Sequence, residues 1–240
     1  MLKYDDELHQ KDVADSLTLG YTQNDAAYAR ATWVLHSPEM SDFLAGKAES
    51  KLLLVNGNSE ATEFISPLSF VCAKITDLMS VSNHIITLTY FCGRHTDELR
   101  EQTANARGML ASLVGQLLTQ IKKSGHKDFN LDLSSVGEDD YSAIEEEDMD
   151  ALFDIFRAVI IQLPKGTVIF CLVDSLSAYE SANRKEDTIA LMQKFARLVK
   201  KATSVEFKLL VTCPGRSLYA DRWGALNDRR SQTLFVPEDL

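Results

Sequence analysis

Apolar residues along this chain gather in short continuous runs, and helical periodicity fills the segments between them. Each run is rich in leucine, β-branched or aromatic residues and ends near Gly, Pro, Asn or Asp, which is typical of buried strands. The runs that predict strands are 51–57, 84–93, 167–174, 207–213 and, more weakly, 233–237.

The segments between the runs carry helix signals. Ser66 is placed to cap a helix whose first turn holds Pro67, which predicts a helix over 67–80. Residues 1–50 show helical spacing without a strand signal, and a short helix is expected at 38–44. Apolar side chains at helical spacing predict the remaining helices, over 101–122, 148–162 and 186–201.

Alternating strands and helices, with strands that are apolar almost throughout, indicate a parallel sheet covered by helices on both faces. A chain of 240 residues is long enough for one such domain. We therefore expect a three-layer α/β domain with a mostly parallel sheet of about five strands and an N-terminal helical arm. The predicted boundary places the arm at 1–46 and the core at 47–240.

The turn after the first strand is the first candidate site, because ligands of an open parallel sheet bind beyond the carboxyl ends of its strands. Gly57 stands where the phosphate-binding motif G-x-x-x-x-G-K-S/T begins. The last three motif positions fall on 62–64 when counted from Gly57, or on 66–68 when aligned on the helix start. Neither alignment supplies the lysine, and Glu60 and Glu63 put negative charge where a triphosphate needs positive charge.

Two further strand ends hold polar residues. Asp174 follows an apolar strand, the arrangement in which a carboxylate helps to hold magnesium in nucleotide hydrolases. Thr212 and Arg216 are placed to probe a terminal phosphate, although a strand leading into a Pro-Gly turn is the plainer interpretation. The candidate nucleotide-binding residues are Gly57, Asn58, Ser59, Ser66, Thr212 and Arg216, with Asp174 as the candidate catalytic residue and magnesium ligand.

The order of these segments resembles the NACHT-type or STAND-type NTPases, which are signalling ATPases abundant in filamentous fungi. The resemblance spans roughly 30–217 and includes WVLHSPEMSDFLAGKAESKLLLVNG, IFCLVDSLSAYE and LLVTCPGRS. It implies a P-loop NTPase-like fold for the core. In the family pattern a second Asp and a Glu follow Asp174, whereas this chain has Ser177 and Ala178, and Glu180 lies two residues late. The departures fall at the lysine, the acidic pair and the sensor arginine, the positions that nucleotide binding and hydrolysis require.

Charge changes the expected partners. The formal net charge is −10, which opposes non-specific binding to nucleic acid because such binding rests on Lys and Arg neutralising phosphates. Lys200, Lys201 and Lys208 would form a basic patch only if they share a face, and a solvated helix end is the favoured interpretation. The pair Arg94-His95, after the second strand, is a further candidate for anion binding.

Cysteine and histidine usage gives no metal or disulfide pattern. The four cysteines occur singly with no C-x-x-C pair, which predicts reduced core thiols and a cytoplasmic, reducing compartment. The five histidines are scattered, and no apolar run reaches the length of about 20 residues that a membrane span needs.

The sequence thus predicts a catalytically degenerate NTPase-like domain that serves as a protein-interaction or signalling scaffold. Its partner is expected to be another protein or a second copy, and no cofactor is expected. The alternative is an atypical ATP- or GTP-binding NTPase that uses magnesium on Asp174 and an unusual phosphate loop. An unrelated enzyme built on Glu145, Glu146 and Glu147 is a third possibility, against which a solvated acidic loop is favoured.

Overall fold

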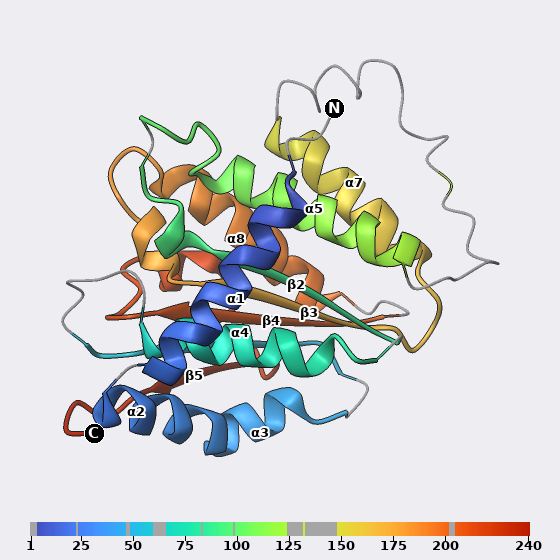
Figure 1. Ribbon diagram of the computed structural model, residues 1–240. Coiled ribbons are helices and arrows are strands. Elements are labelled where there is room, and N and C mark those ends of the chain that lie inside the picture. The colour runs from blue at the N-terminus through green and yellow to red at the C-terminus, as the bar shows by residue number, and fades with distance from the viewer. Residues whose placement is uncertain are drawn as a thin grey trace.

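Five apolar runs form one sheet in the computed structural model of the protein, which describes residues 4–22, 24–46, 49–59, 66–82, 84–97, 99–123, 132, 148–201 and 205–240. The strands are β1 (Lys51–Asn56), β2 (Ile85–Phe91), β3 (Val168–Asp174), β4 (Glu206–Cys213) and β5 (Ser231–Phe235). Every neighbouring pair is parallel, in the order β2-β3-β4-β1-β5 (Figure 1). The predicted α/β fold with a parallel sheet is confirmed.

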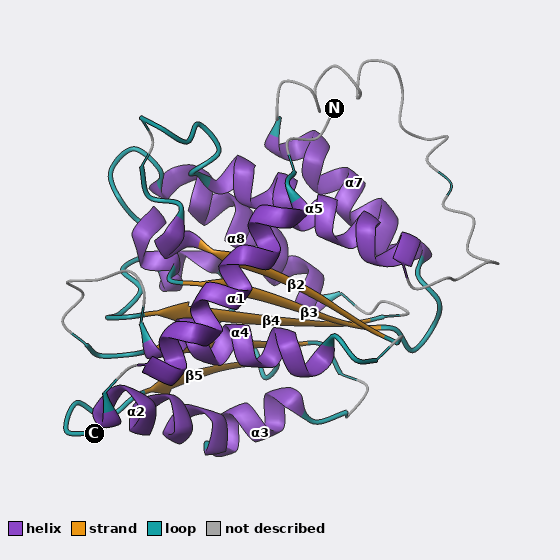
Figure 2. Ribbon diagram, viewed as in Figure 1, coloured by secondary structure: helices purple, strands orange, loops and turns teal. Residues whose placement is uncertain are grey.

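Helices cover both faces of the sheet and make three layers (Figure 2). The helices are α1 (Asp6–Thr22), α2 (Asp25–His36), α3 (Pro38–Leu44), α4 (Pro67–Met79), α5 (Ala106–Lys123), α7 (Met149–Gln162) and α8 (Lys185–Lys200). Short 3-10 turns follow three of the strands: η1 (Cys92–Arg94), η2 (Leu176–Tyr179) and η3 (Ala220–Trp223). Helices α2, α3 and α4 pack on one face, and α5, α7 and α8 pack on the other.

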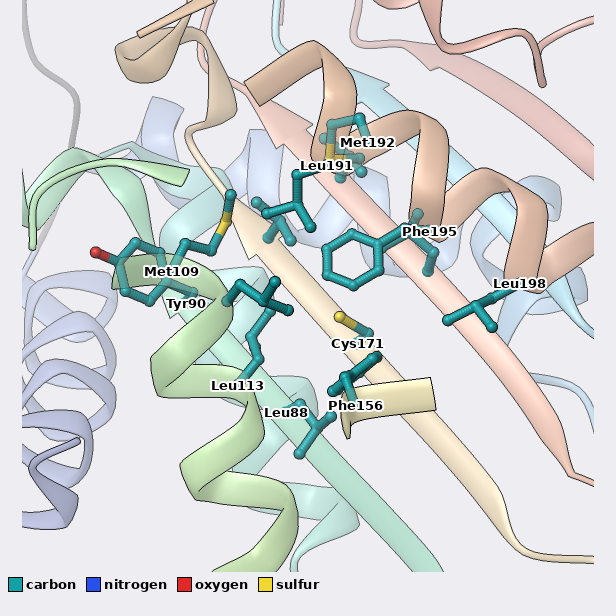
Figure 3. Packing of buried hydrophobic residues seen from close by; sticks show 14 of the residues in the cluster. Leu88, Tyr90, Met109, Leu113, Phe156, Cys171, Leu191, Met192, Phe195 and Leu198 are labelled. Atoms are coloured by element: carbon teal, nitrogen blue, oxygen red, sulfur yellow. The ribbon is translucent and has the colours of Figure 1, made fainter. Parts of the chain in front are cut away.

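Alternate residues of each strand supply the two cores, which explains why the strands are apolar almost throughout. Leu52 packs with the cluster under α5, α7 and α8, while Leu53 and Val55 pack with the cluster under α2, α3 and α4. Figure 3 shows Cys171 of β3 and Phe195 of α8 meeting in the first of these clusters. Both faces are therefore closed, which leaves the strand ends as the place for a site.

The largest differences between predicted and observed boundaries are at α5 and β5. Helix α5 begins at Ala106 rather than at residue 101, because the Asn105 side chain accepts hydrogen bonds from the backbone N–H groups of Arg107 and Gly108, both at 3.0 Å. Strand β5 begins and ends two residues earlier than the predicted 233–237. β5 is a partly exposed edge strand that begins with the polar residues Ser231 and Gln232. A prediction from apolar residues alone therefore placed its start too late.

The helices before β1 share a core with the rest of the molecule. Val34 and Phe43 belong to the same buried cluster as Leu53 and Val71. The shared core gives no separate unit for residues 1–46 that would test the predicted boundary, which stays a prediction. Within the part of the chain that the structure describes, no helix is both long and apolar enough to cross a bilayer.

Candidate functional site

The carboxyl ends of β1, β3 and β4 lie side by side, since these strands are close neighbours in the sheet. Asn56 pairs in register with Cys213, and Val173 pairs with Val211. The two described non-glycine residues with positive φ, Asn58 at 52° and Ser175 at 55°, both lie in turns at this edge. Such backbone conformations are uncommon for side chains with a Cβ and tend to gather at functional edges.

Asp174, the last residue of β3, is 1% exposed and accepts three hydroxyl hydrogen bonds. Its Oδ1 accepts from Thr212 Oγ1 at 2.6 Å. Its Oδ2 accepts from Ser69 Oγ at 2.7 Å and from Ser175 Oγ at 3.0 Å. Burial raises the pKa of Asp174, while these donors act to lower it. Hydroxyl groups on three different elements therefore hold the carboxylate inside the protein.

Ser69 is the residue that sequence reasoning missed at this carboxylate. Ser66 caps α4 by accepting from Leu68 N–H at 3.2 Å, and Ser69 Oγ accepts from Ser66 N–H at 3.1 Å. This reciprocal capping box aims the Ser69 hydroxyl at the end of β3. The spacing Ser66-x-x-Ser69 before an apolar helix is a signal that could have identified it.

The contact between Ser69 and Asp174 also shifts the motif alignment. In the phosphate-binding motif, the hydroxyl residue at the start of the helix lies near the carboxylate that follows the neighbouring strand. The alignment on 66–68 gave this place to Leu68, but the structure brings Ser69 there. Leu68 then occupies the lysine position, and its side chain is buried, at 3% exposure.

The turn after β1 is hydrogen-bonded to the turn after β4. The backbone N–H groups of Gly57, Asn58 and Ser59 donate to carbonyls of residues 213–215, at 2.8, 3.1 and 3.0 Å. A phosphate loop instead directs such amides toward its anion. Glu60 and Glu63 and the motif positions 62–64 lie outside the described residues.

Arg216 is turned toward the end of β5. Its Nε donates to Asn58 Oδ1 at 2.6 Å, and its guanidinium lies 5.5 Å from the centre of the Phe235 ring. Thr212 points instead toward Asp174, to which it donates its hydroxyl hydrogen. The structure therefore separates the candidate residues into one group around Asp174 and another around Arg216.

The group around Arg216 borders an open depression of about 710 Å³. A second arginine, Arg30 of α2, reaches this place and donates to the carbonyl oxygens of Gly57 and Pro237. Arg30 was not predicted, because nothing in its local sequence distinguishes it. The residues that line the depression are Arg30, Asn58, Ser59, Gly215, Arg216 and Glu238.

Glu180 has a structural position near the site. It is 6% exposed, and its two carboxylate oxygens accept from Ser217 Oγ at 2.5 Å and from Leu218 N–H at 2.8 Å. These bonds fasten the turn after β3 to the turn after β4. Both oxygens are thus engaged in holding the loops together.

The pair Arg94-His95 is wrong as an anion site. Arg94 Nη1 lies 3.2 Å from Asp15 Oδ2. His95 Nε2 lies 2.9 Å from Asp12 Oδ2, and its Nδ1 lies 2.6 Å from Glu101 Oε1. Carboxylates therefore occupy the positions that an anion would need.

The fold and this edge define the class of protein: an α/β domain with the layout of a P-loop NTPase, in which a strand, a turn and a capped helix face a carboxylate on a nearby strand. The chain belongs to the family described as Nephrocystin 3, N-terminal, whose model matches residues 30–213. That family is associated with NACHT proteins, in keeping with the resemblance seen over 30–217.

Similarity to individual proteins is slight. No curated protein sequence matches the chain. A solved structure, "Structure of Drosophila ORC bound to GC-rich DNA and Cdc6", matches with a TM-score of 0.41 and 10% identity. The match covers 98% of this chain and 34% of that chain, so this chain spans about a third of the length of its match. A likeness at this score supports no conclusion about function.

Proposed function

We propose that this protein is a catalytically degenerate member of its class and that it acts as a protein-interaction or signalling scaffold. The observation that carries the proposal is the turn after β1, where the first three amides are all donated to residues 213–215. Residues 57–67 contain neither lysine nor arginine. A polyphosphate at this turn would therefore lack these three amides and any cation from residues 57–67.

Electrostatics support the same conclusion. Glu60 and Glu63 follow Gly57 in the sequence, and the whole chain carries a net charge of −10. Two like charges about 4 Å apart repel by about 4 kcal/mol at an effective dielectric constant of about 20. Arg216, the cation predicted for the phosphate site, has Asn58 and Glu238 as partners.

One observation favours an alternative, an ATP- or GTP-binding domain that uses magnesium. The carboxylate of Asp174 and the hydroxyl of Ser69 are oxygen donors of the kind that Mg²⁺ prefers, and they are 2.7 Å apart. These residues fit the metal half of such a site. The described start of the turn after β1, residues 57–59, does not fit the phosphate half, because its amides are donated to residues 213–215.

Nucleotide binding distinguishes the two functions. We expect ATP and GTP at millimolar concentration, with Mg²⁺, to leave the unfolding temperature of the protein unchanged. Under the alternative, a ligand present at about 100 times its dissociation constant adds about 2.7 kcal/mol of stability. EDTA should then remove the shift, as should Asp174→Ala. A magnesium-dependent shift, or magnesium-dependent hydrolysis of ATP lost in Asp174→Ala, would contradict the proposal.

The scaffold function also has a direct test. We propose that the partner is another protein or a second copy of the chain, in a reducing, cytoplasmic compartment. The four cysteines are free and buried, which supports reducing conditions. Sedimentation velocity over a concentration series tests self-association. Purification of the tagged protein from cells, with cross-linking, tests for another partner, and a chain that stays monomeric and captures no protein would contradict the proposal.

A further inference from the structure

Helix α1 is attached to the molecule in an unusual way. It lies outside the 30–213 family match and crosses the sheet edge beside β2, above α4 (Figure 1). Its buried residues are Asp12, Ser16 and Gly20, whereas Val13 and Leu17 are only partly buried. A surface helix normally buries an apolar stripe. Polar contacts thus contribute much of what holds α1 in place.

The central polar contact is His95, at the end of β2. The residue is 6% exposed, and each ring nitrogen lies within hydrogen-bond distance of a carboxylate, Asp12 of α1 at 2.9 Å and Glu101 at 2.6 Å. A neutral imidazole has only one N–H, and the imidazolium has two. Both contacts are therefore hydrogen bonds only when the ring is protonated.

Charged neighbours surround this ring from several elements. Arg94 strengthens the attachment by donating to Asp15 at 3.2 Å and to Ser16 at 3.2 Å, both on α1. Burial acts to lower the pKa of His95, but Asp12 and Glu101 outweigh it and the pKa is raised. The titratable and charged side chains around the ring come from four places: Tyr4 and Asp5 before α1, and His9, Asp12 and Asp15 on it; Tyr90 on β2; Arg94 on η1; and Glu101 in the following loop. Tyr179 and Arg184 lie beyond the Tyr90 ring.

We propose that α1 is a pH-sensitive clasp, in which protonated His95 fastens the helix to the end of β2 and loss of that proton releases it from the sheet edge. Two cavities, of about 320 and 310 Å³, flank the N-terminal part of α1 and share Tyr4 and His9 as lining residues. At the other end of the helix, Val13 and Leu17 pack against the core and Tyr21 lies against Phe70 of α4, so release concerns the N-terminal part of α1. Release uncovers the end of β2 around His95 and the two cavities beside it.

The direction of the pH effect follows from the sign of the shift. Because the folded pKa of His95 lies above the unfolded value of about 6.5, the protonated form stabilises the attachment. That contribution is complete below the unfolded pKa. It is lost as the pH rises through the folded pKa.

Hydrogen exchange measured by mass spectrometry, from about pH 6 to about pH 9 and corrected for the intrinsic rate, tests the clasp. We expect protection of the α1 amides to fall as the pH rises through the folded pKa of His95, by up to about ten-fold per pH unit between the unfolded and folded pKa values, while protection of α8 stays constant. His95→Gln should lower α1 protection at low pH to the level that wild type shows at high pH, and should remove its pH dependence. The matched control is His36→Gln, at an exposed histidine of α2, which should keep the wild-type profile.

A milder variant covers the case in which His95→Gln does not fold. Asp12→Asn removes one carboxylate from the ring, so the midpoint of the His95 titration, followed by NMR, should fall. The midpoint of α1 release should fall with it. The proposal is overturned if α1 protection does not change with pH, or if it changes identically in wild type and Asp12→Asn.

Discussion

Asp174 is a buried carboxylate whose environment pulls its pKa in two directions. Burial disfavours the charged form, and hydroxyl donors from Thr212, Ser69 and Ser175 favour it. The net effect raises the pKa of Asp174. The raised pKa therefore means that burial outweighs the hydroxyl donors.

Asp174→Asn should change the pH dependence of stability. Because the pKa of Asp174 is raised on folding, its contribution is greatest below the unfolded pKa of about 3.9 and is lost as the pH rises through the folded pKa. We therefore expect Asp174→Asn to be more stable, relative to wild type, at about pH 7.5 than at about pH 4.5. Denaturant titrations at the two pH values measure it.

The control for this prediction is Asp154→Asn, at an exposed position of α7. Its difference from wild type should be about the same at both pH values. If Asp174→Asn loses stability as the pH rises, the carboxylate stabilises the fold in its charged form and the inferred balance is wrong.

Gly57 is required by a close approach of two backbones. A Cβ at this position would meet the carbonyl oxygen of Pro214 at 2.3 Å. Gly57→Ala should therefore destabilise the protein by about 1–3 kcal/mol, the usual effect of forcing atoms into a packed site. Thermal unfolding measures the loss. Gly46→Ala is the matched control, since a Cβ there meets nothing within 4 Å, and an equal loss in both variants would contradict the explanation.

At the scale of elements, the edge strand β2 is closed by the helix that follows it. Gln116 of α5 accepts from Thr89 N–H at 2.8 Å and donates to Thr89 O at 2.8 Å. Gln120, one turn later, makes the same pair of bonds with Thr87, at 3.1 and 2.7 Å. An open edge presents unpaired N–H and C=O groups to other strands. The two glutamines take the place of a sixth strand.

Gln116→Met tests how much these side-chain hydrogen bonds to β2 contribute to stability. Methionine fills a similar volume but leaves two buried backbone groups of Thr89 without partners, at about 1–3 kcal/mol for each group. We expect a loss of about 2–6 kcal/mol in the free energy of unfolding, and an increased tendency to self-associate through β2. Denaturant titration and sedimentation velocity measure the two effects.

Gln120→Met provides the comparison. Gln120 is only partly buried, so water replaces its hydrogen bonds and the loss should be smaller. Equal losses in the two variants, or a Gln116→Met protein as stable as wild type, would show that the side-chain bonds to β2 contribute little.

At the scale of the whole molecule, the formal net charge is −10. Of the three lysines considered as a basic patch, Lys208 is 1% exposed and donates to the carbonyl oxygens of Phe43 and Ala45, at 2.9 and 2.5 Å. Burial lowers the pKa of Lys208. Lys208 thus takes no part in a surface patch with Lys200 and Lys201.

The protein should therefore not bind DNA without sequence preference. We expect fluorescence anisotropy of a labelled duplex to show no binding at protein concentrations up to about 100 μM in about 150 mM salt. A protein known to bind the same duplex verifies the assay. Micromolar binding that weakens steeply with added salt would contradict this prediction.

Much of the fold could be predicted from the sequence, because buried apolar residues recur with the period of each helix or strand. The apolar runs were enough to locate the five strands. Ser66 with Pro67 correctly predicted the start of α4. The prediction failed at the start of α5, where a capping side chain, Asn105, outweighed a pattern of apolar residues. Local signals of that kind are weaker than burial.

The candidate site was predictable only in part. Asp174 and Thr212 were found because each lies at the end of a strand. Ser69 was missed because its role depends on a partner 105 positions away in the chain. The bonds of His95 to Asp12, and of Gln116 to Thr89, likewise join residues far apart in sequence.

The sequence by itself determined which segments are strands and helices, that the sheet is parallel, and that residues 57–67 contain no cation. Only the tertiary structure decided the strand order, the hydroxyl partners of Asp174 and the attachment of α1 through His95. The physical reason is that hydrophobic burial is non-directional and repeats with the period of each element, so it can be seen locally. A hydrogen bond needs two particular atoms about 3 Å apart, and the packing of distant elements alone brings such atoms together.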